Sequence, residues 1–432
     1  NGDTTQGTFS PFSQTGWGNY FDGSGDALRI SASALSSSSF TIEGWVFYTG
    51  SSSTSATVFD FANAANGYGM YLQHSSTGNL ICQFFSNNTG TSIGMISSSF
   101  SGYYNQWVHV AVTYDGSTYR MFVNGQLTGT PVSSVTQVVA INLLTIGGRS
   151  DSPTPAQVWF GYISNFRYVT GAALYTSNFT PPATSLSIAG SGTTQWLTCQ
   201  SNRFVDNSTT PKTITVLGNT SVQAFSPFAP TSSYSAAAVG GSGYFDGSSD
   251  YLTVPDNAAW DVGSSNFTIE GWFYPTGSPA QPILIGQWTT SYSWVMLLSN
   301  DSNRYIRGIL YNGSAFSDYV STAPLQLNAW NHCAFVRESN TVSLYLNGSR
   351  VLTNTFTGAV ATSTSAVSLG ANASGADPYL GYMSGARVVV GTALYSGTTY
   401  TVPTAPLTAV TNTQLLLNFT NAGVVDATAK ND

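Results

Sequence analysis

The residues best suited to acid–base chemistry are two glutamates that stand in the same six-residue motif. Phe-Thr-Ile-Glu-Gly-Trp contains Glu43 in its first copy and Glu270 in its second. Hydrolysis of a glycosidic bond uses two neighbouring carboxyl groups, and neither motif has a second carboxylate beside it. Each copy is followed further along by an arginine, Arg167 or Arg387. Because a buried carboxylate is costly unless it is paired, we predict two structural ion pairs, Glu43–Arg167 and Glu270–Arg387.

Two histidines also repeat, and their surroundings argue against catalysis. His109 and His332 each follow a tryptophan by two residues, so on a strand each would share a sheet face with that tryptophan. No cluster of cysteines or carboxylates stands near either of them in the sequence, so a metal site or a nucleophilic triad would lack partners. We expect packed strand histidines.

Aromatic residues offer a second kind of chemistry, the stacking of rings on a sugar. Candidates for carbohydrate binding lie in the second half of the chain, where two of them have no counterpart in the first half. Tryptophan and tyrosine also fill the cores of β-sandwiches, so a core role stays open for each. The candidates are Trp288, Tyr292, Trp294 and Tyr311.

The elements that must position these residues are β-strands, and they occur twice. Tyr-Phe-Asp-Gly-Ser, Phe-Thr-Ile-Glu-Gly-Trp, Trp-x-His and a hairpin Asn-Gly recur in the same order in the 432 residues. Apolar and polar residues alternate over short runs that end in Gly, Ser, Asn or Pro, which is typical of strands. Asn124-Gly125 and Asn347-Gly348 predict type I′ hairpins. We therefore predict an all-β fold of two tandem antiparallel β-sandwiches.

Composition excludes several classes of protein. Only 7% of residues are charged and the net charge is −7, whereas nucleic-acid binding requires clustered Lys and Arg. No apolar run is long enough for a membrane helix. The chain begins with Asn instead of Met, so we expect a processed chain or part of a longer one.

The ordered series of motifs resembles a known superfamily. Phe-Asp-Gly-x-x-Asp, Phe-Thr-Ile-Glu-x-Trp, Trp-x-His-x-Ala and an Asn-Gly hairpin are followed by Gly-Tyr-Ile-Ser-Asn-Phe-Arg or Gly-Tyr-Met-Ser-Gly-Ala-Arg. This series is similar to tandem laminin-G-like, concanavalin A-type jelly rolls. The Ser/Thr-rich, lysine-poor copies also look like repeats in virion structural proteins of marine bacteriophages and in bacterial surface proteins.

The resemblance implies a possible calcium site, although we expect no cofactor to be required. Laminin-G-like domains often bind one Ca²⁺ at a loop edge through oxygen ligands. No dense calcium motif is present, so the prediction consists of scattered candidates. They are Asp60, Asn63, Asp151 and Asp377.

The position of the domain boundaries follows from aligning the two copies. Gly2 aligns with Gly218, so the first copy lacks an equivalent of the strand-like segment 194–217, and a similar segment follows residue 410. We therefore predict a first jelly roll at 1–185 without its opening strand, a second at 186–410, and a spare opening strand at 411–432. The spare strand would complete another copy by strand addition. Its apolar residues are Leu415, Leu416, Leu417 and Phe419.

Together these observations predict a non-enzymatic structural or adhesive repeat protein. It would belong to an extracellular fibre, a cell surface or a virion appendage, and copies would assemble head-to-tail. A lectin-like adhesin that binds cell-surface glycans is the main alternative, and a glycan hydrolase is a weaker one. Neither nucleic acid nor membrane insertion is expected.

Overall fold

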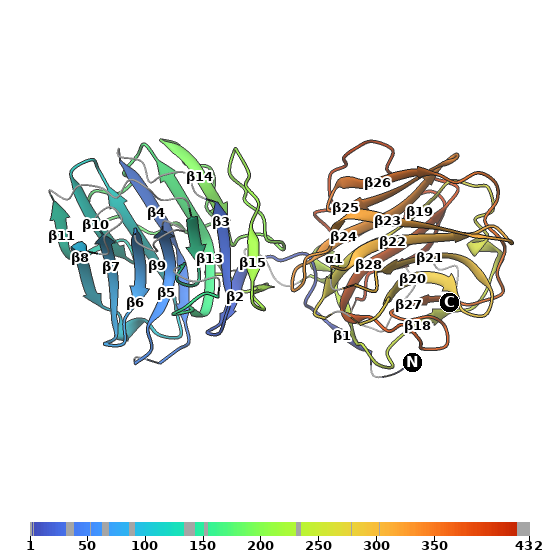
Figure 1. The fold of residues 1–432 in the computed structure, drawn as a ribbon, viewed down its shortest axis with the longest axis horizontal. Coiled ribbons are helices and arrows are strands. Elements are labelled where there is room, and N and C mark those ends of the chain that lie inside the picture. The colour runs from blue at the N-terminus through green and yellow to red at the C-terminus, as the bar shows by residue number, and fades with distance from the viewer. Residues whose placement is uncertain are drawn as a thin grey trace. The chain divides into compact units, whose positions relative to one another are not determined.

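The protein forms two compact units in a computed structural model (Figure 1). One unit is Thr15–Thr231, here the first domain; the other combines Asn1–Gln14 with Ser232–Asp432, here the second domain. The structure describes residues 2, 4–31, 39–51, 53–62, 69–85, 91–133, 143–150, 154–229, 235–277, 279–301 and 303–420.

The first domain consists of two antiparallel sheets. The eight-stranded sheet has the order β11 (Gln126–Ser133), β10 (Thr118–Val123), β9 (Trp107–Tyr114), β4 (Phe40–Tyr48), β13 (Phe160–Thr170), β2 (Gly18–Asp22), β16 (Ser221–Gln223), with β14 (Thr193–Thr198) also paired to β13. The seven-stranded sheet has the order β15 (Thr215–Leu217), β3 (Ala27–Ser31), β12 (Leu143–Ile146), β5 (Ala56–Ala62), β6 (Met70–His74), β7 (Asn79–Phe85), β8 (Ser92–Ser99). A 3₁₀ turn, η1 (Ser101–Tyr103), precedes β9.

The second domain repeats this plan. Its eight-stranded sheet has the order β1 (Thr5–Gly7), β17 (Ser242–Asp246), β28 (Leu380–Val390), β19 (Phe267–Pro275), β24 (Asn331–Glu338), β25 (Thr341–Leu346), β26 (Ser349–Thr355), with β29 (Thr413–Leu417) also paired to β28. The six-stranded sheet has the order β18 (Leu252–Val254), β27 (Val367–Leu369), β20 (Ile283–Trp288), β21 (Tyr292–Leu298), β22 (Tyr305–Tyr311), β23 (Phe316–Pro324). The short helices are α1 (Ala236–Val239) and η2 (Ala258–Trp260).

Local sequence accounts for this architecture. Asn124 and Asn347 have φ of 48° and 51° and the following glycines also have positive φ, as a type I′ turn between two strands requires. Alternate residues of the strands point into the space between the two sheets. In the second domain Ile269 and Phe335 of one sheet and Met296 of the other belong to one buried core. The prediction of two antiparallel β-sandwiches in tandem is confirmed.

The structure places three strands of the predicted second jelly roll, β14, β15 and β16, in the first domain. The segment assigned to the start of the second jelly roll contains β14, and β14 pairs with β13 of the first domain. β15 and β16 also belong to the first domain, where they pair with β3 and β2. The first domain therefore extends well beyond residue 185 and is not missing this strand (Figure 1).

The spare C-terminal strand is accounted for in the same way. β29 pairs with β28 of the second domain, with Leu415 opposite Val388 and Leu417 opposite Ala386. Leu415, Leu417 and Phe419 lie in the buried core of that domain, and Leu416 is buried as well. Donation of this strand to another copy is therefore not what the structure shows. In a repeating sequence, the last strand of one domain and the first strand of the next fall at the same position of the repeat. Alignment alone therefore could not show to which domain the strand belongs.

Candidate functional site

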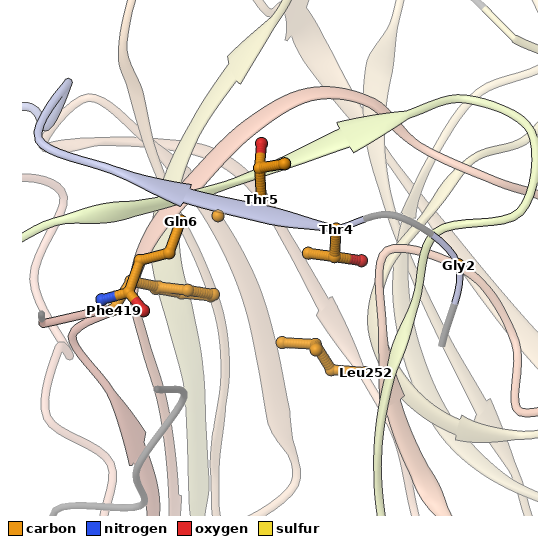
Figure 2. A pocket seen from close by; sticks show the side chains of 7 residues that line it. Gly2, Thr4, Thr5, Gln6, Leu252 and Phe419 are labelled. Carbon is orange, nitrogen blue, oxygen red and sulfur yellow. The ribbon is translucent and has the colours of Figure 1, made fainter. Parts of the chain in front are cut away.

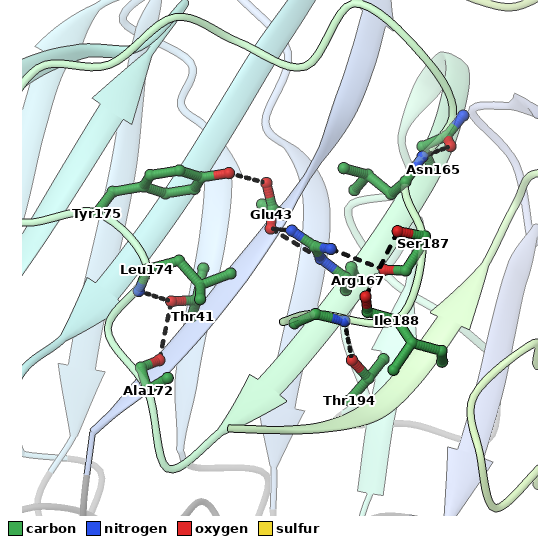
Figure 3. Close-up of polar contacts among 12 residues, drawn as sticks. Thr41, Glu43, Asn165, Arg167, Ala172, Leu174, Tyr175, Ser187, Ile188 and Thr194 are labelled. Atoms are coloured by element: carbon green, nitrogen blue, oxygen red, sulfur yellow. Dashed lines mark hydrogen bonds and ion pairs between the residues drawn. The ribbon is translucent and has the colours of Figure 1, made fainter. Parts of the chain in front are cut away.

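The first repeated cluster surrounds Glu43, which lies on β4 in the eight-stranded sheet of the first domain (Figure 3). Arg167 donates to Oε1 of Glu43 from Nε at 2.9 Å and from Nη2 at 2.5 Å. Tyr175 donates its hydroxyl to Oε2 at 2.9 Å. Nε2 of His109 lies 3.2 Å from the same oxygen, and the imidazole must be the donor because a carboxylate only accepts. One buried carboxylate is thus held by three side chains.

The second domain builds the same cluster around Glu270. Arg387 donates to Oε1 from Nε at 2.9 Å and from Nη2 at 2.5 Å. Tyr395 donates to Oε2 at 2.7 Å, and Nε2 of His332 lies 3.4 Å from that oxygen. The two ion pairs expected from the sequence are therefore present, and each also engages the repeated histidine and a tyrosine.

A β-bulge brings each arginine opposite its glutamate. The register between β4 and β13 shifts between Ser164 and Arg167, after which Arg167 lies directly across from Glu43. Asn165, within the bulge, has a φ of 53°, and the equivalent Gly385 has 56°. Asn and Gly tolerate this left-handed conformation better than other residues. The motif Ser-Asn/Gly-x-Arg thus re-aims the arginine side chain.

Each cluster fastens a connecting segment, here called the strap, across the sheet. The strap is 171–192 in the first domain and 391–412 in the second. Nη1 of Arg167 donates to the strap carbonyl of Ser187 at 2.7 Å, and Nη1 of Arg387 donates to that of Thr408 at 2.6 Å. Tyr175 is itself a strap residue. The clusters are structural clamps, and their carboxylates are engaged by cations instead of by a second acid.

The charge state of the glutamates follows from these contacts. Desolvation by burial would raise the pKa of Glu43, but the hydrogen bond from His109 and the charge of Arg167 outweigh it and lower the pKa. The pKa of Glu270 is lowered by the same balance. Burial, and then the charge of Glu43, raises the pKa of Tyr175, so its phenol stays protonated and remains a donor.

We expect both domains to lose stability in acid through these clusters. A carboxylate with a depressed folded-state pKa contributes stability above its unfolded pKa and loses it as pH falls through the folded value. The loss should therefore begin below the ordinary glutamate value of 4.5. Urea unfolding measured from pH 7 to pH 3 checks this. The double variant Glu43→Gln, Glu270→Gln should be less stable at pH 7 and show a weaker pH dependence; an unchanged pH slope would contradict the assignment.

The second feature is a cluster of aromatic rings in the six-stranded sheet of the second domain. Trp288 and Tyr292 have ring centroids 4.8 Å apart, and Tyr311 and Phe316 are 4.7 Å apart. Phe316 joins the two pairs at 5.4 Å from both Trp288 and Tyr292. Tyr292 is 36% exposed and Phe316 is 54% exposed. A monomeric domain rarely exposes contiguous rings without use for them.

Neighbouring residues extend this aromatic face. Ile283, Val295 and Leu297 form a second apolar cluster, separate from the main core, against which Trp288 packs. On the adjoining strands Arg307 and Asp318 form an ion pair whose Nε–Oδ1 distance is 3.2 Å. The arrangement combines flat apolar rings with charged groups that can donate to and accept from hydroxyls.

Three of the four sequence-predicted carbohydrate-binding residues lie on this face, and one does not. Trp294 is fully buried in the core of the second domain, and its indole donates to the carbonyl of Trp260 at 3.2 Å. The cause is a register shift in the β20–β21 pairing between Gly286 and Trp288, which separates Tyr292 from Trp294 although they are two residues apart. Phe316 was missed by sequence reasoning, although its place across a short turn from Tyr311 could have identified it.

The corresponding sheet of the first domain carries polar groups instead. Oδ2 of Asp60 accepts from the backbone nitrogen of Ser150 at 2.8 Å, from its hydroxyl at 2.6 Å, and from Nε of Arg149 at 3.2 Å. The guanidinium of Arg149 lies 4.3 Å from the ring centre of Tyr71, and the Tyr71 hydroxyl donates to Gln83. The two domains therefore present different chemistry on equivalent sheets.

The calcium candidates do not converge on one place. A cation at Asp60 would have to displace the guanidinium of Arg149, and Asp377 belongs to the other domain, where it is exposed. Asn63 and Asp151 lie outside the described residues. Within the part of the chain that the structure describes, no group of three or more His, Cys, Asp or Glu could hold a metal ion. The calcium site stays a prediction.

Comparison with known proteins identifies the family. The family model of the concanavalin A-like lectin/glucanase superfamily matches residues 22–174 and 246–393. The chain belongs to this superfamily. The match falls once on each domain, so the resemblance seen in the sequence is confirmed for both copies of the concanavalin A-like fold. No curated protein sequence matches the chain. Among the described residues, no helix is long and apolar enough to cross a membrane.

Several solved structures are similar to this chain at low sequence identity. Domains LG4-5 of the mouse laminin alpha1 chain share 13% identity, cover 91% of this chain and 96% of that one, and have a TM-score of 0.30. A putative carbohydrate binding protein from Bacteroides ovatus shares 12% identity, with 97% and 90% coverage and a TM-score of 0.35. Domain 4 of AbnA, an extracellular arabinanase of Geobacillus stearothermophilus solved with arabinotriose, shares 19% identity, with 38% and 78% coverage and a TM-score of 0.30.

Proposed function

We propose that this protein is a non-enzymatic, extracellular adhesive protein whose second domain binds carbohydrate. It would serve as a structural part of an extracellular fibre, a cell surface or a virion appendage. The observation that carries the proposal is the aromatic face formed by Trp288, Tyr292, Tyr311 and Phe316. The superfamily to which the chain belongs is described as containing lectins as well as glucanases, and fold alone does not choose between them.

The chemistry of the face suits a sugar. Tryptophan and tyrosine offer a rigid apolar surface together with a polar group, at a small cost in conformational entropy. The partly exposed rings of Tyr292 and Phe316 can cover the apolar face of a pyranose. Arg307 donates and Asp318 accepts, and both lie beside the rings. Because neutral or acidic sugars could use these groups, the class of ligand is a glycan and not one particular sugar.

The hydrolase alternative has less support. Glu43 and Glu270, the carboxylates of the repeated strand motif, are each bound by an arginine and a tyrosine and are buried. Retaining and inverting glycosidases both require two carboxyl groups that flank the bond to be cleaved. The aromatic face has one carboxylate among the residues named here, Asp318, and it is paired with Arg307.

A glycan array probed with the intact chain tests the proposal. We expect binding to a defined set of glycans, with no change in the mass of those glycans after prolonged incubation. Arms with added Ca²⁺ and with EDTA show whether the predicted calcium site takes part. Absence of binding to every glycan would overturn the carbohydrate-binding function, and release of shortened glycans would overturn the non-enzymatic one.

A further inference from the structure

Two short segments dock on the two domains in the same way. The N-terminal clasp is defined here as residues 2–14 and the internal clasp as residues 218–229. β1 of the N-terminal clasp pairs with β17, with Thr5 opposite Tyr244. β16 of the internal clasp pairs with β2, with Ser221 opposite Tyr20. Each clasp thus adds an antiparallel edge strand to the eight-stranded sheet of one domain.

The anchoring contacts also correspond one to one. Gly2 and Gly218 have φ of 68° and 65°, and a Cβ at either would lie only 2.4 or 2.3 Å from an oxygen of an aspartate, so glycine is required at both. Ser10 donates to the carbonyl of Val239, and Ser226 donates to that of Thr15. The segments are equivalent parts of one repeat.

Each clasp inserts two phenylalanines among aromatic residues of the sheet. Phe9 lies 5.0 Å from Tyr274, 5.4 Å from Trp330 and 5.1 Å from Tyr382, measured between ring centroids. Phe225 makes the matching set in the first domain, with Phe47 at 5.1 Å, Trp107 at 5.1 Å and Tyr162 at 4.7 Å. Phe12 and Phe228 contact Trp272 and Trp45 at 5.9 and 6.1 Å.

The order of the segments along the chain differs between the two clasps. The internal clasp follows the strands of the first domain and precedes β17, and it docks on the domain before it. The N-terminal clasp precedes β2, yet the domain on which it docks is the one that comes later in the chain. If the N-terminal clasp docked as the internal clasp does, it would bind the domain that precedes it in a repeating series of domains.

We propose that the N-terminal clasp of one copy docks on β17 of the second domain of another copy, which links copies head-to-tail. Every contact described above for the N-terminal clasp joins it to the second domain alone, so the second domain of another copy can supply the same contacts. Such an exchange costs little because it replaces one set of interactions by an identical set. The interface is heterologous, since the clasp of one copy meets the sheet edge at β17 of another, and it can therefore repeat along a series of copies.

The docked strand is suited to leave and rejoin. β1 is three residues long, and Thr5 and Gln6 are exposed. A hollow of about 130 Å³ remains beside it, where Gln6 lies near Phe419 and Thr4 faces Leu252 (Figure 2). The strand is thus held mainly by backbone pairing and by Phe9 and Phe12. Higher protein concentration should favour docking between copies over docking within one chain.

Covalent trapping between single-cysteine variants tests the exchange. Chains with Thr5→Cys are mixed with chains with Tyr244→Cys and treated with a short thiol crosslinker. We expect a crosslinked dimer whose fraction rises with concentration. The matched control pairs Thr5→Cys with Tyr20→Cys on β2, where the internal clasp supplies the edge strand; it should give several-fold less dimer. The native cysteines give little background, because burial raises the pKa of each thiol: Cys82, Cys199 and Cys333.

A chain that carries both Thr5→Cys and Tyr244→Cys keeps the test decisive. We expect it to give a ladder of covalent multimers at high concentration and a crosslinked monomer at low concentration. A crosslinked monomer at every concentration, with no more dimer in the mixture than in the control pair, would overturn the exchange. Absence of any crosslink in this chain would overturn the exchange as well, because it would show that β1 does not pair with β17.

Discussion

Glu270→Ala is expected to destabilise the second domain by about 3–5 kcal/mol. The substitution leaves the guanidinium of Arg387 buried. Of its hydrogen bonds described above, only the one to the carbonyl of Thr408 remains. Tyr395 loses its acceptor at the same time. A charge that is buried without its counter-ion costs far more than the net contribution of the pair. The strap loses one of its attachments to the sheet.

Urea unfolding of the intact chain measures this effect. Glu43→Ala should shift the unfolding transition of the first domain, so the transition that it leaves unchanged belongs to the second domain. Glu338 is an exposed glutamate at the end of β24, so Glu338→Ala is the matched control and should change stability by less than about 0.5 kcal/mol. The double variant Glu270→Met, Arg387→Met removes both charges and should lose less than Glu270→Ala. Equal stability of Glu270→Ala and the native chain would contradict the clamp.

Leu415→Ala should also destabilise the second domain, by about 2–5 kcal/mol. Leu415 is fully buried in β29 and belongs to the core of that domain. Removal of its side chain leaves a cavity between the sheets, which the surrounding residues fill only in part. The expected effect depends directly on β29 closing its own domain instead of serving another copy.

The same unfolding assay applies to this variant, with Val410→Ala as control. Val410 precedes β29 and is 37% exposed, so its truncation should be nearly neutral. A Leu415→Ala chain that unfolds like the native protein would show that β29 does not contribute to the fold of the second domain.

Local patterns in the sequence were sufficient for the fold and for the glutamate–arginine pairs, but they did not reveal that a histidine and a tyrosine also contact each glutamate. Alternating apolar residues and the turns at Asn124 and Asn347 specify strands and hairpins through nearest-neighbour geometry. The ion pairs were predictable because Glu43 and Arg167 are rare charges in a chain that is 7% charged. A charge at a buried position needs a partner, and few were available.

The features that sequence reasoning missed depend on register and on repeat phase. A one-residue shift in the β20–β21 pairing sends Trp294 into the core while Tyr292 stays exposed, and alternation alone gives no sign of it. β14 and β29 belong to the domains that precede them because they pair with β13 and β28. A repeating sequence does not show which strand begins a domain, so this pairing could not be predicted from it. The exposed ring of Phe316 required knowledge of the hairpin that brings it to Tyr311.

The aromatic face is the centre of the proposed function, and Trp288 is the residue on which it depends most. Trp288 contacts both Tyr292 and Phe316 and also packs against the apolar cluster beneath the face. Central aromatic residues of this kind carry most of the binding energy of an interface. Trp288→Phe keeps an aromatic ring there, whereas Trp288→Ala removes it.

Calorimetric titration of the native chain and the Trp288→Ala chain with the strongest glycan from the array is the most direct test. The aromatic face predicts that Trp288→Ala raises the Kd by about tenfold or more, the equivalent of roughly 1.4 kcal/mol. Trp288→Phe should keep part of the affinity and Val410→Ala all of it, with thermal unfolding used to confirm that each variant is folded. An unchanged Kd for a folded Trp288→Ala chain would contradict carbohydrate binding at this face.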